Sequence, residues 1–160
     1  MRPTLLFVYG TLRADLTHPM HRFLRRYAVF VGKATAQGEL YEIARYPGMV
    51  LSSNPRNIVC GELYRIRRTK PLLKLLDRYE ECGEGFDEPH EYRREIIRVV
   101  GIKGCAEAWA YIYNRSVATK RRIKSGDYLF KNAATPPCAL RCRRLWCSRL
   151  LKNAASRSHR

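Results

Sequence analysis

Several apolar segments of the chain have the length and pattern of β-strands. Residues 5–9 form a short, continuous apolar run that ends at Gly10, which predicts a buried strand. Residues 58–66 alternate between apolar and polar positions and predict another strand. Residues 92–100 and 105–113 are separated only by the short segment GIKG. This spacing indicates a β-hairpin.

A further part of the chain between these two strands is also predicted to be extended. Residues 29–43 read as strand, with interruptions at Gly32 and Gly38. The motif YPGM at residues 46–49 predicts a turn, because Pro fixes φ at the corner and Gly accepts a positive φ.

Apolar residues recur at helical spacing in two places. Residues 18–27 predict a short helix. A clearer helix begins at Thr69, which can cap it, and Pro71 is tolerated in its first turn. It is predicted to end near Glu80 or Glu81, before Gly83 and Gly85. Three of its apolar positions recur at i, i+4 and i+7: Leu72, Leu76 and Tyr79.

The predicted strands outnumber the two helices that interrupt them. This order favours an α+β fold, either a strongly bent sheet or a small barrel, with the helices packed outside. We expect the domain to occupy residues 1–137. Residues 138–160 have a different, basic composition, and we expect this tail to lie outside the core fold.

The net positive charge of the chain is compatible with several classes of partner and does not distinguish among them. The 160-residue chain has a formal charge of +17, of which seven Lys or Arg and no acid fall in residues 138–160. A basic field attracts nucleic acids, anionic membranes and acidic metabolites alike. The tail itself is interpreted either as an extension without fixed structure or as a basic amphipathic helix that touches membrane or nucleic acid.

The sequence gives no evidence for several common classes of protein. No segment approaches the roughly 20 apolar residues that span a bilayer, and the first apolar run is too short for a secretory signal. We therefore expect a cytoplasmic protein. The six Cys include no CxxC pair, so neither a zinc ribbon nor a disulfide scaffold is indicated. No P-loop, GxGxxG or GxSxG motif is present.

The residues after the first predicted strand are a candidate binding site. In Tyr9-Gly10-Thr11-Leu12, successive backbone N–H groups can form a concave nest for a carboxylate or phosphate. Gly10 has no Cβ to block a close approach, and Thr11 adds a hydroxyl donor. The alternative is an ordinary strand end.

The end of the second predicted helix offers a candidate acid or base. Glu80 lies where the helix dipole is negative, and Glu81 places a like charge beside it. Both effects raise the pKa of a carboxyl group, which suits a general acid or base near neutral pH. Asp77 either orients neighbouring groups or is a surface residue. The alternative for Glu80 is likewise a solvated side chain at a helix end.

Six short motifs follow one another along residues 5–130. They are FVYGTLR (7–13), GELY (61–64), LLDRYEE (75–81), EYRRE (91–95), AWAYIYN (108–114) and SGDY (125–128). This ordered set resembles the γ-glutamylcyclotransferase-like superfamily, which includes γ-glutamylamine cyclotransferases and AIG2-like proteins.

The resemblance implies a small mixed β-barrel with flanking helices, and a cavity between the YGTL turn and the LDxxE helix. In that family the turn, here Tyr9, Gly10, Thr11 and Leu12, holds the carboxylate end of the substrate. The Glu of LDxxE falls on Glu80 and is the catalytic acid and base. Tyr92 matches a Tyr that precedes an Arg on the following strand.

The implied activity is cyclisation of a γ-glutamyl amine or peptide to 5-oxoproline, with release of the free amine and with no metal or cofactor. The partner would be a small γ-glutamyl substrate. Two alternatives stay open: a non-catalytic small-molecule binder or regulator on the same barrel, and a nucleic-acid-binding protein driven by charge. The second of these lacks any aromatic pair or zinc-finger spacing typical of RNA or DNA recognition.

Overall fold

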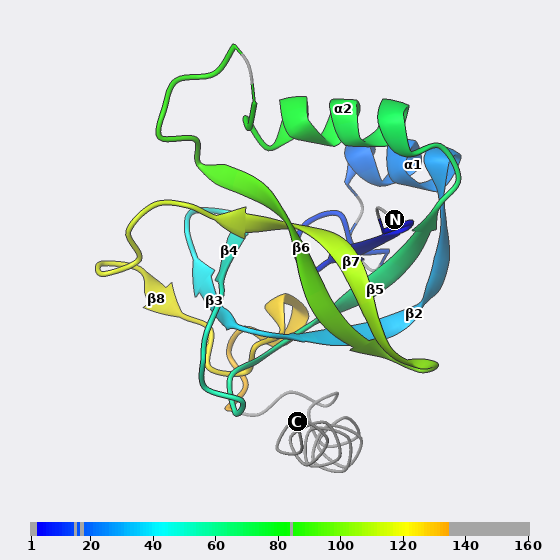
Figure 1. Cartoon of the computed structure of the whole chain (residues 1–160). Coiled ribbons are helices and arrows are strands. Elements are labelled where there is room, and N and C mark those ends of the chain that lie inside the picture. Colours follow the sequence, from blue (N-terminus) through cyan, green and yellow to red (C-terminus); the bar gives the residue numbers. More distant parts are fainter. Residues whose placement is uncertain (1–2, 15, 17, 84, 135–160) are drawn as a thin grey trace, which may run out of the picture.

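Five strands close into a barrel in the computed structural model, which describes residues 3–14, 16, 18–83 and 85–134 (Figure 1). The strand order around the barrel is β1-β5-β2-β6-β7. β1 runs parallel to β7, and the other neighbours are antiparallel, so the barrel is mixed. The strands are β1 (Leu5–Val8), β2 (Ala28–Gln37), β5 (Ile58–Ile66), β6 (Tyr92–Gly101) and β7 (Gly104–Tyr113). The α+β fold with a small mixed β-barrel is confirmed.

The two glycines that interrupt the long extended segment mark real irregularities. Gly32 has a φ of 152°, and the pairing of β2 with β5 shifts register between Phe30 and Gly32. Such a shift bends a strand and helps a sheet to close. Gly38 separates β2 from β3 (Glu39–Glu42), where the chain leaves the barrel.

A second, three-stranded sheet has the order β4-β3-β8, with β4 at Pro47–Val50 and β8 at Arg121–Arg122. The expectation of a turn at residues 46–49 is wrong, because Pro47 is the first residue of β4. The chain turns just before it, where the Ile43 N–H donates to the Tyr46 carbonyl at 3.1 Å. Pro is tolerated there because β4 is an edge strand and Pro47 begins it.

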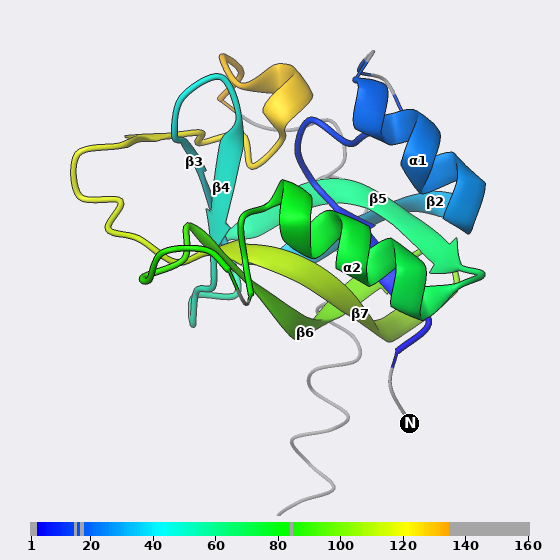
Figure 2. The same cartoon turned by 90° about the horizontal axis from the view of Figure 1, so that it is seen from above.

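Two helices cover one side of the barrel and lie side by side (Figures 1 and 2). They are α1 (Pro19–Tyr27) and α2 (Thr69–Tyr79), and a 3-10 helix η1 (Tyr128–Phe130) follows the small sheet. Thr69 is not the cap of α2. It is the first helical residue, and Arg68 precedes it without a side-chain hydrogen bond to the helix. Among the described residues, no helix is long and apolar enough to cross a membrane.

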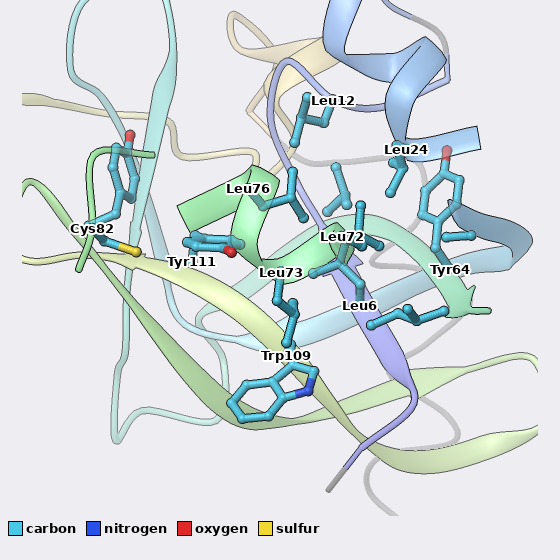
Figure 3. Packing of buried hydrophobic residues seen from close by; sticks show 14 of the residues in the cluster. Leu6, Leu12, Leu24, Tyr64, Leu72, Leu73, Leu76, Cys82, Trp109 and Tyr111 are labelled. Carbon is cyan, nitrogen blue, oxygen red and sulfur yellow. The ribbon is translucent and has the colours of Figure 1, made fainter. Parts of the chain in front are cut away.

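Two of the three positions in the predicted apolar stripe of α2, Leu72 and Leu76, pack against the barrel, whereas the third, Tyr79, is exposed (Figure 3). Leu72 and Leu76 are almost fully buried, and Leu73 reaches toward the Trp109 side of the barrel. Burying a leucine side chain stabilises the fold by about 1.5–3 kcal/mol. This packing fixes the position of α2 and, with it, of the residues at its C-terminal end.

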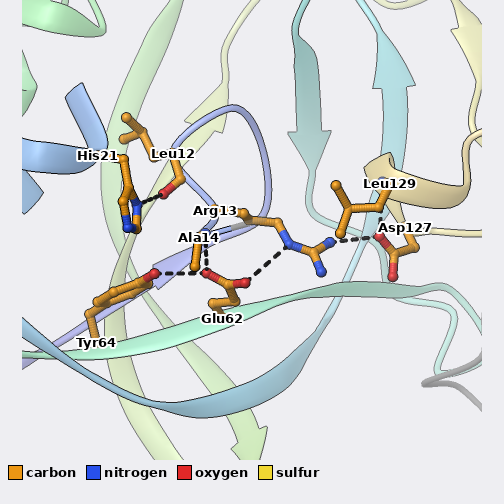
Figure 4. Close-up of polar contacts among 8 residues, drawn as sticks. All are labelled: Leu12, Arg13, Ala14, His21, Glu62, Tyr64, Asp127 and Leu129. Carbon is orange, nitrogen blue, oxygen red and sulfur yellow. Dashed lines mark hydrogen bonds and ion pairs between the residues drawn. The ribbon is translucent and has the colours of Figure 1, made fainter. Parts of the chain in front are cut away.

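A buried ionic cluster joins three distant segments (Figure 4). The side chain of Arg13 is almost fully buried, and its Nη1 donates to Asp127 Oδ1 at 2.6 Å. Its Nε lies 3.7 Å from Glu62 Oε1. The other oxygen of Glu62 accepts hydrogen bonds from the Ala14 N–H and the Tyr64 hydroxyl, each at 2.8 Å. The cluster therefore holds the chain after β1 against β5 and the segment that precedes η1.

Substitution of Asp127 by Asn should destabilise the protein by roughly 3 kcal/mol, because breaking a buried ion pair leaves a buried charge uncompensated. The amide keeps an acceptor for the Leu129 N–H, so the lost charge is the main change. Asp87→Asn removes the same charge from an exposed position and is the control, with an expected effect within about 0.5 kcal/mol. Urea unfolding of the three proteins measures both differences. Equal stability of Asp127→Asn and the wild type would contradict a structural role for the cluster.

The predicted tail at residues 138–160 lies outside the described residues. The boundary at residue 137 and both interpretations of the tail therefore stay predictions.

Candidate active site

The turn after β1 is held in place at both ends. The Arg13 N–H donates to the Gly10 carbonyl at 3.1 Å and closes the turn. At its start, the buried Tyr9 hydroxyl donates to the Tyr111 carbonyl at 2.6 Å and accepts from the Met49 N–H at 3.3 Å. Tyr9 thus links β1 to both the barrel and the small sheet.

Gly10 is required for packing within the protein. A Cβ at this position would lie 2.9 Å from Pro47 Cγ. The sequence-based expectation was that Gly10 leaves room for a ligand. Gly10 lines the cavity, so that expectation stays a prediction. The missing side chain also lets Pro47, the first residue of β4, approach the turn.

The C-terminal end of α2 presents Glu80 to the same region. Glu80 is the C-cap of the helix, and its N–H donates to the Leu76 carbonyl at 2.8 Å. Glu81 follows with a φ of 50°, a left-handed conformation that ends the helix. The predicted helix end is therefore confirmed.

Asp77 orients neighbouring groups, one of the two roles left open for it. Its Oδ1 accepts from Arg94 Nη1 at 2.7 Å and from the Tyr111 hydroxyl at 2.7 Å. Arg94 is on β6 and Tyr111 is on β7. Asp77 therefore ties the last turns of α2 to two barrel strands and limits the movement of Glu80.

One cavity of about 610 Å³ is lined by every residue that the sequence assigns to the site. The turn and the end of α2 face it from different elements, and β6 supplies a side chain from a third. The predicted site residues in its lining are Tyr9, Gly10, Thr11, Leu12, Glu80 and Tyr92. The structure thus brings all six together, and their individual roles stay predictions.

Burial makes Glu80 an unusual carboxyl group. Loss of solvation raises the pKa of Glu80 to about 8, and the nearby charge of Glu91 adds to the shift. The sequence suggested Glu81 as the neighbouring charge. Glu81 also lines the cavity, but the charge that raises the pKa of Glu80 is that of Glu91.

The tyrosines around Glu80 stay protonated and are already hydrogen-bonded. Burial, together with the charge of Glu80, raises the pKa values of Tyr9 and Tyr92 well above that of free tyrosine. The Tyr92 hydroxyl donates to the Pro47 carbonyl at 3.0 Å. Both residues therefore offer ring surfaces to the cavity, while their hydroxyl groups maintain its shape.

The lining also contains polar residues that were not predicted as site residues, among them His18, Arg45, Tyr46 and Glu91. The Tyr46 hydroxyl donates to Glu91 Oε1 at 2.9 Å. Burial and this carboxylate raise the pKa of Tyr46 to about 12. Glu91 opens the EYRRE motif, which was the only signal that could have drawn attention to it. Arg45 and Tyr46 precede β4 in a loop without any such pattern.

The described residues contain no group of three or more His, Cys, Asp or Glu side chains arranged to hold a metal ion.

Sequence comparison identifies the family. The model of the family described as "Gamma-glutamyl cyclotransferase, AIG2-like" matches residues 6–130. The chain belongs to this family.

A curated member of the gamma-glutamylcyclotransferase family is the protein YtfP of Escherichia coli. It is 32% identical over 127 residues, which cover 78% of this chain and 95% of YtfP. The solution structure of E. coli ytfP has a TM-score of 0.56 at 31% identity, covering 81% of this chain and 99% of that one. An AIG2-like protein from Mus musculus has a TM-score of 0.59 at 21% identity, covering 72% and 80%. The mouse structure shows the shared fold of this cyclotransferase family.

The raised pKa of Glu80 predicts a pH-dependent cost to the stability of this family member. The folded protein keeps a proton on Glu80 up to about pH 8, whereas a glutamate in the unfolded chain loses its proton near the ordinary pKa of 4.5. Stability should therefore fall as pH rises between these values. Glu80→Gln removes this ionisation, so its melting temperature should rise relative to wild type from pH 5 to pH 8. A constant difference between the two proteins over that range would contradict the shift.

Proposed function

We propose that this protein cyclises a γ-glutamyl amine or γ-glutamyl peptide to 5-oxoproline and releases the free amine. The observation that carries the proposal is the position of Glu80. A carboxyl group with a pKa of about 8 lines the same small cavity as the backbone of the turn after β1.

The turn is suited to hold the glutamyl carboxylate. Backbone N–H groups that converge in a turn bind anions, and those of Gly10, Thr11 and Leu12 belong to residues that line the cavity. The rings of Tyr9 and Tyr92 provide walls for the methylene groups of the substrate. This arrangement would fold the glutamyl chain back on itself and bring its α-amine close to its γ-carbonyl carbon.

The reaction then needs only proton transfers and one exchange of bonds. Glu80 removes a proton from the α-ammonium group, and the freed amine attacks the γ-carbonyl carbon to form a five-membered ring. The tetrahedral intermediate collapses as the bond between that carbon and the leaving nitrogen breaks. Glu80 gives its proton to the leaving nitrogen, and the second proton that the attacking nitrogen loses in becoming the lactam N–H also passes to that nitrogen. The amine therefore leaves as an ammonium ion, and Glu80 ends as the carboxylate with which it began. Because the attack is intramolecular, correct orientation supplies much of the acceleration.

The shifted pKa suits Glu80 to both proton transfers. A pKa of about 8 brings the Glu80 carboxyl group much closer to the basicity of an amine than the pKa of an ordinary glutamate does. This shift lowers the free-energy cost of moving a proton from the substrate ammonium group to Glu80. An ordinary glutamate, with a pKa of about 4.3, would be a much weaker base toward the same amine.

Glu80→Gln should lower the rate of 5-oxoproline release by about 10²–10⁴-fold, the usual contribution of a general acid or base. The assay uses a panel of γ-glutamyl amines, γ-glutamyl amino acids and glutathione as substrates. Glu81→Gln removes the same charge from the next residue of the cavity lining and serves as the matched control, with a loss of less than about tenfold. Equal rates for Glu80→Gln and wild type would reject the role of Glu80. Binding of panel members without any 5-oxoproline release would instead support a non-catalytic binding protein.

Glu91→Gln should shift the acidic limb of the pH profile of kcat/KM to lower pH. The substitution removes a negative charge that raises the pKa of Glu80, so the active, ionised form appears at lower pH. The amide oxygen can still accept the hydrogen bond from Tyr46. Because the substrate is the same for both enzymes, its own ionisation cancels from the comparison.

The exposed Glu88 on the same loop is absent from the cavity lining, so Glu88→Gln is the control for a general change in charge. Profiles of Glu91→Gln and Glu88→Gln that shift by the same amount would contradict a local effect of Glu91 on Glu80.

A further inference from the structure

A second cavity, of about 900 Å³, lies beside α1 and is strongly basic. Its lining comes from described residues that precede α1, from α1 itself, from the start of β2, from Tyr64 on β5 and from Arg67 after β5. The charged or ionisable side chains in that lining are His18, His21, Arg22, Arg25 and Arg67. None of the described lining residues is an Asp or Glu. The proposed cyclotransferase reaction makes no use of this cavity.

We propose that this cavity binds a nucleotide, with its phosphate groups on the three arginines and its base on Phe30. The inference does not rest on the proposed function, because the two cavities share only His18 among their lining residues.

The three arginines are available to an anion. Arg22 and Arg25 are exposed and three residues apart on α1, so their side chains leave the helix on neighbouring positions of one face. Arg67 approaches from the segment after β5, where its N–H donates to the Tyr27 carbonyl at 2.7 Å. No ion pair within the described residues engages any of these three guanidinium groups. Guanidinium groups that line one cavity and have no ion-pair partner among the described residues are suited to phosphate oxygens.

His21 adds a further polar group to the cavity wall (Figure 4). Its Nδ1 lies 2.9 Å from the Leu12 carbonyl oxygen. Since a carbonyl oxygen only accepts hydrogen bonds, Nδ1 must carry the proton and donate it. This bond orients the ring and leaves Nε2 for a ligand.

Phe30 supplies an aromatic surface at the same cavity. Half of its surface is exposed, at 50%, which is high for an aromatic ring in a barrel strand. Its ring meets Tyr64 edge to face, with 5.6 Å between centroids and 69° between planes. The contact holds the ring in place, so an aromatic base could stack on its exposed surface.

The size of the cavity favours a small ligand. Cavities of roughly 300–1,000 Å³ are typical of small-molecule sites, and a nucleotide carries both the phosphate groups and the aromatic ring that this lining accommodates. A long nucleic acid also carries phosphate groups and aromatic bases, so the experiment must distinguish it from a single nucleotide.

Calorimetric titration of the full chain with ATP, AMP, adenosine, inorganic pyrophosphate and a single-stranded oligonucleotide tests the ligand. We expect ATP to bind more tightly than AMP, and both more tightly than adenosine, because the phosphates meet the arginines. ATP should also bind more tightly than pyrophosphate, because the base meets Phe30. Equal affinities for ATP and pyrophosphate, or binding of the oligonucleotide alone, would overturn the proposal.

Two pairs of variants test the site. Arg25→Gln and Arg26→Gln remove the same charge from exposed positions in the last turn of α1, but only Arg25 lines the cavity. Arg25→Gln should weaken ATP binding by about tenfold, which corresponds to about 1.4 kcal/mol, while Arg26→Gln stays within about twofold of wild type. Equal losses in both variants would show general electrostatic attraction, including that of the basic tail, and would overturn the proposal.

Phe30→Ala and Phe23→Ala form the second pair. Both rings are about half exposed, and only Phe30 lines the cavity. Phe30→Ala should reduce the affinity for ATP and leave the affinity for pyrophosphate unchanged, whereas Phe23→Ala should change neither. Full ATP affinity in Phe30→Ala would rule out stacking on this ring.

Discussion

The structure depends on the burial of one positive charge, the guanidinium of Arg13. A buried charge is tolerated only when it is paired and hydrogen-bonded. Arg13 meets that requirement with Asp127 and Glu62, which lie 114 and 49 positions further along the chain. If either segment moved away, the charge would lose a partner, so the cluster holds the first turn, β5 and the segment before η1 in one arrangement. The candidate anion-binding turn immediately precedes this arginine.

The position of Glu80 has a separate origin in the packing of α2. Leucines on one face of the helix pack against the barrel, and Asp77 accepts hydrogen bonds from Arg94 and Tyr111. These contacts hold the helix end beside the turn, where Glu80 is partly removed from water. The same burial that raises its pKa to about 8 also costs stability when the carboxyl group ionises. The burial of Glu80 thus both raises its pKa and lowers the stability of the fold when the carboxyl group ionises.

Much of the fold could be predicted because it follows from local patterns. The barrel strands and both helices come from apolar periodicity, and the register shift near Gly32 comes from a residue that tolerates unusual φ values. The two errors concern residues whose local preference is compatible with more than one structure. Pro47 begins an edge strand, where a missing N–H costs nothing, and Thr69 is the first residue of the helix that it was expected to cap. At Pro47, pairing with β3 decided between the local alternatives.

The sequence by itself determined where the barrel strands and helices lie in the chain, where α2 ends, and which motifs place the chain in its family. Only the tertiary structure decided that Glu91, rather than the adjacent Glu81, raises the pKa of Glu80. It also decided that Pro47 is the neighbour that requires Gly10. The physical reason is that desolvation, charge interaction and steric contact depend on distance through space. Residues far apart in the chain reach those distances only after the barrel has closed.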